Sequence, residues 1–184
     1  MIRKTALAAA LALGVISSAQ AVDSVSFEWG RGSENTALWR AGVQWNWPHR
    51  WFAQRAWTLG AYWDLQVGRW SGPEHRGQRD AGQDETWDIG FTPVFRLSRA
   101  ERTAIAPYAE GAIGFHMLSD LNINFRRIFT THFQYGDHIG AGARFGPGYR
   151  YDAQVRLQHL SNGGLAHPNP GINFLQLRLA YHFD

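Results

Sequence analysis

The chain has no cysteine, a single lysine and no long hydrophobic run beyond its first residues. Its 184 residues suffice for one domain with a sizeable core. Without cysteine there is no disulfide, so a small exported protein of this kind must draw its stability from its own architecture. After the N-terminal segment, no stretch approaches the roughly 18 consecutive apolar residues of a membrane-spanning helix. A helical membrane protein is therefore excluded.

The first 21 residues are organised like a secretory signal peptide. Arg3 and Lys4 supply the positive start, residues 5–16 the apolar stretch, and Ala19-Gln20-Ala21 a cleavage site of the small-x-small type. The alternative is a helix of the mature protein, but the apolar stretch is short for a span of about 20 residues. We expect residues 1–21 to be removed on export and residues 22–184 to form one domain.

Charge of neither sign dominates the mature chain. Removing Arg3 and Lys4 leaves 16 basic residues, all of them arginine, against 15 acidic residues. Nucleic acid is therefore not an expected partner, and no repeat, low-complexity tract or interdomain linker divides the chain.

Aromatic residues and glycine are abundant instead. The sequence holds 9 Trp, 11 Phe, 6 Tyr and 20 Gly, yet its mean hydropathy is only −0.34. In a transmembrane β-barrel only every second residue meets lipid, so the average hydropathy stays low. Composition and export together favour an outer-membrane β-barrel.

Eight segments alternate between apolar residues at odd positions and polar or small residues at even positions. They cover residues 25–29, 39–47, 57–67, 87–95, 105–117, 133–145, 151–161 and 175–183. A period of two indicates strands, and eight is the smallest usual number for a closed outer-membrane barrel. The pattern predicts an all-β fold, an eight-stranded antiparallel transmembrane barrel with salt bridges filling its interior. A soluble all-β barrel or sandwich is the alternative, but it would expose too much apolar surface.

The connections between these segments alternate in length. The shorter are 48–54, 98–102 and 146–148, and the longer are 69–83, 118–131 and 162–172. Short turns of outer-membrane barrels are periplasmic and long loops are extracellular. The seventh strand therefore ends near the outer leaflet, where the eighth begins.

Three polar residues share the outward parity at that rim. His159 and Ser161 are neighbours on one strand face, and Asn173 opens the next strand. Histidine can take the proton of a serine that attacks an ester, and asparagine can hold the imidazole by a hydrogen bond. Gly163 and Gly164 allow backbone N–H groups to turn toward an oxyanion. Serine and asparagine as ordinary turn formers are the alternative explanation.

The stretch His159-Leu160-Ser161-Asn162-Gly163-Gly164-Leu165, followed by Pro168-Asn169-Pro170-Gly171-Ile172-Asn173, resembles the C-terminal signature of the lipid A 3-O-deacylase (PagL-type) family. The resemblance implies an outer-membrane serine esterase that removes the 3-O-linked 3-hydroxyacyl chain of lipid A. It implies His159 as the base and Ser161 as the nucleophile. It also implies support from Asn162 and, through its backbone at the oxyanion hole, from Asn169.

The sequence departs from the family pattern at one position, because Asn173 stands where that pattern has a glutamate. Either the triad is His-Ser-Asn, or another carboxylate serves. Glu28 is a poor candidate, since its parity points it into the barrel.

Three hypotheses compete on the sequence. The first is a lipid A deacylase with lipopolysaccharide as its substrate in the outer leaflet. The second is a non-catalytic small barrel with a structural or adhesive role, and the third is a soluble exported binding module. No metal-ligand spacing, phosphate-binding glycine motif or G-x-S-x-G elbow occurs, so no cofactor is expected. The oligomeric state stays open, with a homodimer as one option.

Overall fold

The structure is a computed structural model that describes residues 21–52, 56–72, 85–99, 104–124 and 127–183. The predicted signal peptide, apart from Ala21, lies outside these residues. The strands are β1 Ser24–Gly32, β2 Ala37–Asn46, β3 Trp57–Ser71, β4 Glu85–Arg99, β5 Ile105–Leu118, β6 Asn122–Asn124, β7 Arg127–Ile128, β8 Phe133–Phe145, β9 Tyr151–Ser161 and β10 Ile172–His182.

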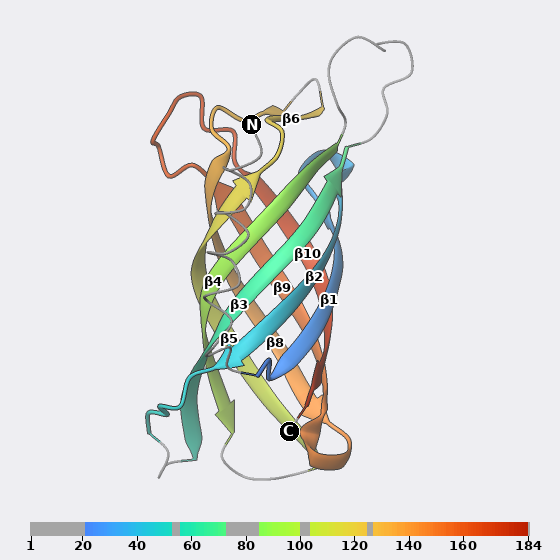
Figure 1. Cartoon of the computed structure of the whole chain (residues 1–184), viewed down its shortest axis with the longest axis vertical. Helices are drawn as coiled ribbons and strands as arrows, with labels where there is room; N and C mark the ends of the chain where they lie inside the picture. Colours follow the sequence, from blue (N-terminus) through green and yellow to red (C-terminus); the bar gives the residue numbers. More distant parts are fainter. Residues whose placement is uncertain (1–20, 53–55, 73–84, 100–103, 125–126, 184) are drawn as a thin grey trace, which may run out of the picture.

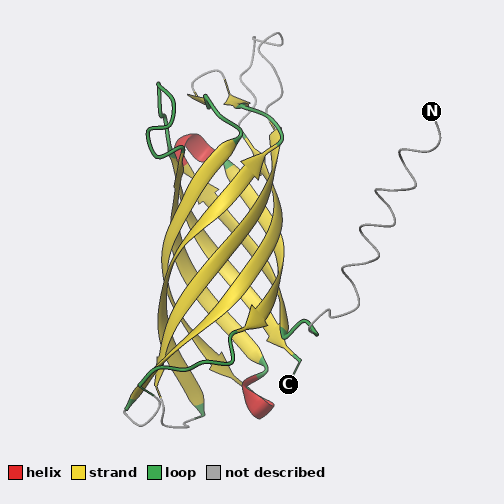
Figure 2. Cartoon of the chain, turned by 60° about the vertical axis from the view of Figure 1, so that its left-hand side comes forward, coloured by secondary structure: helices red, strands yellow, loops and turns green. Residues whose placement is uncertain are grey.

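Eight of these strands close an antiparallel barrel in the order β1-β10-β9-β8-β5-β4-β3-β2 (Figure 1). The predicted fold is confirmed, and the wall consists of long tilted strands with almost no helix (Figure 2). Closure pairs β1 with β10, so that the wall has no free edge. Within the described residues, no helix has the length and hydrophobicity needed to cross a membrane.

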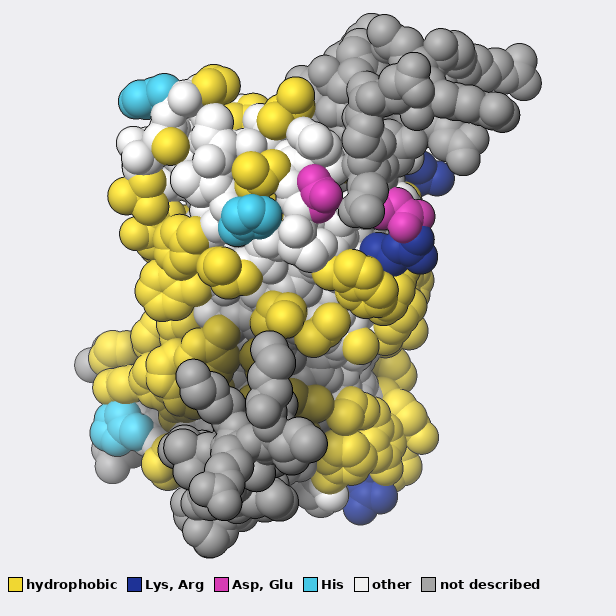
Figure 3. Space-filling model, turned by 45° about the horizontal axis from the view of Figure 1, so that its top comes forward, with side chains coloured by type: hydrophobic (Ala, Val, Ile, Leu, Met, Phe, Trp, Pro, Cys, Tyr) yellow, Lys and Arg dark blue, Asp and Glu magenta, His cyan; other side chains and the backbone are white. Residues whose placement is uncertain are grey.

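The predicted alternation decides which side chains face outward. In β9 the even residues from Asp152 to Leu160 are buried, whereas Tyr151, Val155 and Leu157 are exposed. The other barrel strands behave alike, and the exposed odd positions form an apolar belt around the wall. Figure 3 shows part of this belt on one face, with acidic and basic side chains gathered above it. An exposed apolar surface of this extent is typical of a protein that faces lipid.

Pro93 interrupts the pairing of β4 with β5. Phe91 pairs with Phe115 and Val94 with Ala112, but the two residues between them on β4 have no partner on β5. Proline has no N–H to donate to the ladder, so one gap is the expected local cost.

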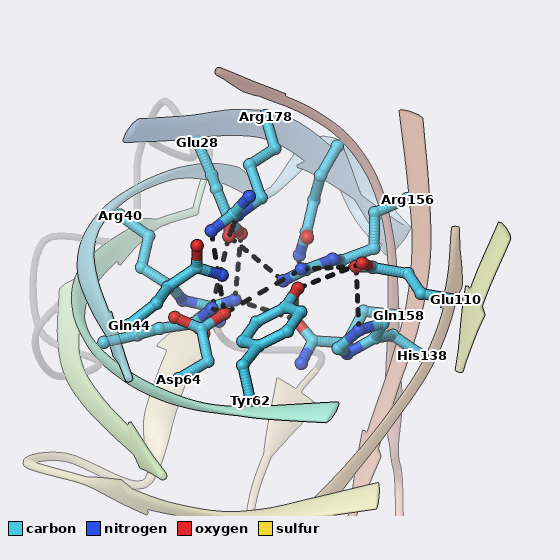
Figure 4. Close-up of polar contacts among 12 residues, drawn as sticks. Glu28, Arg40, Gln44, Tyr62, Asp64, Glu110, His138, Arg156, Gln158 and Arg178 are labelled. Atoms are coloured by element: carbon cyan, nitrogen blue, oxygen red, sulfur yellow. Dashed lines mark hydrogen bonds and ion pairs between the residues drawn. The ribbon is translucent and has the colours of Figure 1, made fainter. Parts of the chain in front are cut away.

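Buried ion pairs fill the middle of the barrel (Figure 4). Arg156 contacts Glu28 at 3.0 Å and Glu110 at 2.9 Å, and Arg178 contacts Glu28 at 3.1 Å. Arg40 joins Asp88 at 2.6 Å. These pairs tie strands from opposite sides of the barrel together, which confirms the predicted interior of salt bridges. Glu28 faces inward, as expected.

An apolar cluster closes one end of the barrel above these ion pairs. Its buried members are Leu38, Trp70, Leu118, Ile123, Phe129, Leu160, Ile172 and Phe174. They come from the ends of five barrel strands and from the connection between β5 and β8. The sequence analysis treated this connection as a loop, whereas the structure places the short β6–β7 hairpin in it. The cluster fixes the end of β9 and the start of β10, where the predicted site lies.

The two ends of the barrel differ as predicted from loop length. Both the first residue of β1 and the last of β10 lie at the end with the short connections. The apolar cluster and the loop between β9 and β10 lie at the opposite end, which is uppermost in Figure 1.

Candidate active site

The end of β9 presents His159 and Ser161 on the outer wall. Between them, the side chain of Leu160 points inward and is fully buried in the apolar cluster. Because side chains alternate along a strand, this anchor forces both neighbours outward, where each is half-buried. A strand with one side chain held in the core thus displays a histidine and a serine at fixed positions.

Asn173 lies directly opposite His159 on β10. The imidazole Nδ1 and the Asn173 side-chain oxygen Oδ1 are 2.7 Å apart. An amide oxygen only accepts, so Nδ1 carries the hydrogen and Nε2 keeps the lone pair that a general base needs. The backbone N–H of Asn173 donates to the Ser33 hydroxyl at 3.3 Å, which connects this strand end to the β1–β2 turn.

Gly171 packs against the opposite side of this imidazole. It has a φ of +45°, and a Cβ at this position would lie 2.9 Å from Cε1 of His159 and 3.4 Å from Nε2. Only glycine fits both the backbone angle and the space. Gly171 was part of the sequence motif, but its role as a wall for the histidine was not predicted, because that role depends on how the loop folds back.

Ser161 is the last residue of β9 and pairs with Tyr135 of β8. Among the hydrogen bonds of the described residues, none joins the Ser161 hydroxyl to the imidazole. The two side chains share a face two residues apart, within reach of each other after a side-chain rotation, and catalytic hydrogen bonds are often longer before substrate binds.

Asn162 organises the loop that follows the serine. Its side chain is 1% exposed, and its amide nitrogen Nδ2 donates to the Thr130 hydroxyl and to the Ala166 carbonyl, both at 2.9 Å. Its Oδ1 accepts the N–H of Gly164 at 2.8 Å. Its own backbone N–H donates to the Asn169 side chain at 3.0 Å. Asn162 and Asn169 therefore lie together, and both shape this loop.

These hydrogen bonds bear on the two glycines whose backbone N–H groups could donate to an oxyanion. Gly163 and Gly164 have φ angles of +65° and +84°, so both adopt the left-handed backbone that favours glycine. The N–H of Gly164 donates to Oδ1 of Asn162 at 2.8 Å. No hydrogen bond within the described residues uses the N–H of Gly163, so that group is the remaining glycine donor beside Ser161.

Asp137 is a residue that the sequence analysis missed. It is exposed on the outer face of β8 and pairs directly with His159. Its odd number already indicated an outward side chain, and the short turn at 146–148 could have supplied the register. Asn173, His159 and Asp137 thus form one row across three strands.

The described residues at the rim do not form a metal-binding site. Across the described ranges, no group of three or more histidine and acidic side chains comes together as metal ligands. The inward histidines His116 and His138 contact Asp88 and Glu110 inside the barrel, at 2.8 and 3.5 Å.

Comparison with known proteins shows the family to which this chain belongs. The sequence model of the lipid A 3-O-deacylase (PagL) family matches residues 36–182. The chain belongs to this family. The lipid A deacylase PagL of Pseudomonas aeruginosa is 33% identical over 172 residues, covering 94% of this chain and 92% of that protein. The lipid A deacylase PagL of Bordetella bronchiseptica is 36% identical over 107 residues, covering 58% of this chain and 55% of that protein.

Comparison with solved structures supports the same barrel fold. The crystal structure of the outer membrane enzyme PagL matches with a TM-score of 0.75 and 27% identity, covering 87% of this chain and 99% of that one. Neisserial surface protein A matches with a TM-score of 0.50 at 8% identity, covering 87% and 95%, which concerns the barrel alone. As a member of the PagL family, the chain is a lipid A hydrolase of the bacterial outer membrane.

Proposed function

We propose that the protein is a serine esterase that hydrolyses the 3-O-linked 3-hydroxyacyl ester of lipid A, with Ser161 as nucleophile and His159 as general base. The observation that carries this proposal lies at the outer rim, where His159, with its tautomer fixed by Asn173, is two residues from Ser161 on the same strand face. The serine and the histidine face the lipid side of the barrel, so the substrate is an ester that lies in the membrane.

Each step of the proposed reaction uses a side chain or backbone group of the site described above. Nε2 of His159 accepts the Ser161 proton while Oγ attacks the ester carbonyl. The N–H of Gly163, two residues after Ser161, donates to the oxyanion. The imidazolium then returns the proton to the leaving lipid A hydroxyl. A water molecule, deprotonated by the same histidine, hydrolyses the acyl-serine and releases the 3-hydroxy fatty acid.

The outer wall below the serine suits acyl chains. Val155 and Leu157 continue the outward row of β9, and Leu175 and Leu177 continue that of β10; the four side chains are 38–54% exposed. A chain attached at the ester level can lie along this apolar strip while the sugar remains at the level of the loops. Because the acyl chain and this strip both contact lipid before they meet, binding removes no further apolar surface from water. Specificity therefore depends on the depth of the ester in the membrane.

The test is mass spectrometry of lipid A from cells that express Ser161→Ala. We expect complete loss of 3-O-deacylation, whereas the matched variant Ser71→Ala should behave like the wild type. Ser71 is also the last, half-buried residue of a barrel strand at the same end, but it lies on β3 across the barrel. Continued release of the 3-hydroxyacyl chain by Ser161→Ala would exclude Ser161 as the nucleophile. Unchanged lipid A with the wild type would favour the non-catalytic barrel.

A further inference from the structure

The outer face of the barrel carries one carboxylate whose position the fold does not explain. Asp137 points outward from the middle of an apolar stretch, with Ile139 two residues away on β8 and Ile113 paired with it from β5. The two isoleucines are 65% and 67% exposed. Within the described residues Asp137 has no hydrogen bond and no ion pair. A charge toward lipid costs free energy, so its presence calls for a function.

The register of the three strands points to that function. Asp137 pairs with His159 across the β8–β9 ladder, as Asn173 does from the other side. Side chains of directly opposed residues on one sheet face have Cβ atoms about 4.5–5.5 Å apart. An opposite charge within about 4–6 Å stabilises the charged form of a titratable group. The imidazole therefore has a neutral amide that orients it on one side and the residue that bears this carboxylate directly opposite on the other.

We propose that Asp137 is the positioning residue that supplies this protein with the negative charge that Asn173 lacks. In this arrangement the two tasks of a triad carboxylate are divided between two strands. Asn173 holds Nδ1 by a hydrogen bond and sets the tautomer, while Asp137 stabilises the imidazolium electrostatically as Ser161 loses its proton. The proposal rests on the proposed function, because it requires His159 to act as the base.

Other charged groups around the imidazole are few. Its own strand contributes Leu157 and Ser161, β10 contributes Asn173, and the loop contributes Gly171, none of which carries a charge. The β1–β2 turn holds Glu34 next to Ser33, which touches the backbone of Asn173. Glu34 is therefore the competing carboxylate, and the experiment must separate it from Asp137.

The experiment compares purified variants on lipopolysaccharide in detergent micelles, with release of 3-hydroxy fatty acid as the readout. For Asp137→Asn we expect kcat to fall about tenfold, or about 1.4 kcal/mol, with KM nearly unchanged. Asp137→Glu should recover most of the rate. Glu34→Gln should leave kcat unchanged.

The decisive experiment places a carboxylate on the Asn173 side of the imidazole ring and asks whether activity returns. In the Asp137→Asn background, Asn173→Glu returns a carboxylate to the imidazole and should restore kcat toward the wild-type value. A residue needed only for folding would not be rescued in this way. The matched control for loss of an outward rim carboxylate is Glu85→Gln, on β4 across the barrel, which should keep wild-type kinetics.

The inference would be overturned if Asp137→Asn kept kcat within about twofold of wild type, or lost activity only through KM. It would also be overturned if Glu34→Gln, and not Asp137→Asn, lowered kcat. Ser161→Ala is run in parallel: if it stays active, the proposed function itself fails, whereas an inactive Ser161→Ala beside a fully active Asp137→Asn removes only the role of Asp137.

Discussion

Replacing Gly171 with alanine tests how closely the loop after β9 positions the histidine. The added Cβ would lie 2.9 Å from Cε1 of His159, whereas ordinary contacts to a Cβ begin at 3.4 Å. The imidazole or the loop must therefore move by about half an ångström. Misplacement of a catalytic group by about 1 Å can reduce the rate by about 10²-fold. We expect kcat to fall roughly tenfold, with KM little changed because the apolar wall stays intact.

The backbone strain of the same substitution needs a separate control. Gly171 has a φ of +45°, and an L-residue in the left-handed region costs about 1–2 kcal/mol whatever its neighbours. Gly148 has a φ of +63° in the β8–β9 turn at the far end of the barrel, and the nearest atoms to a Cβ there are 3.9 Å away. Gly148→Ala therefore carries the strain without the clash, and should lose stability but keep its activity.

The assay is release of 3-hydroxy fatty acid from lipopolysaccharide under initial-rate conditions, together with the thermal unfolding midpoint of each variant. If Gly171→Ala and Gly148→Ala show equal activity at equal stability, the contact between Gly171 and the imidazole has no role in catalysis. If both lose activity in proportion to their unfolding midpoints, strain alone explains the effect.

Two further substitutions test the support beneath the site. Arg156→Ala leaves Glu28 and Glu110 buried without their shared partner, so we expect a loss of about 3–5 kcal/mol in unfolding free energy, measured by denaturant titration of the barrel. Asn162→Ala removes its side-chain bonds to Thr130, Ala166 and Gly164, each worth about 1 kcal/mol. Because these bonds hold a loop outside the barrel wall, their loss favours local opening of the loop; kcat should fall while the unfolding midpoint of the barrel changes little, and an unchanged kcat would mean that the loop holds its shape without them.

The strands and the outward site could be predicted from sequence because both depend on local parity. Every odd residue from 151 to 157 is aromatic, small or aliphatic, so the face of His159 and Ser161 follows without knowledge of any partner strand. The PagL-type signature was recognisable for the same reason, since residues 159–173 are contiguous.

What the sequence analysis missed depends on register and on long-range contacts. In a hairpin around the 146–148 turn, Phe145 pairs with Tyr151, and counting outward places Asp137 opposite His159. That count was available from the sequence, but only under the assumption of an unbroken ladder without bulges. The loop gave no comparable signal, because the Asn162 side chain is held by Thr130, from a connection about thirty residues earlier.

The barrel explains how a lipid-facing site can be rigid without being enclosed. Arg156 and Leu160 hold β9 from inside, one through buried ion pairs and the other through the apolar cluster. Their odd-numbered neighbours are consequently fixed relative to the membrane, as a preorganised site requires. Ser161 is the last residue of its strand, so its height above the apolar belt is set by strand length rather than by a mobile loop. In the proposed mechanism, the ester that reaches this height is the one that reacts, so that depth in the membrane selects the substrate as a closed pocket does in a soluble esterase.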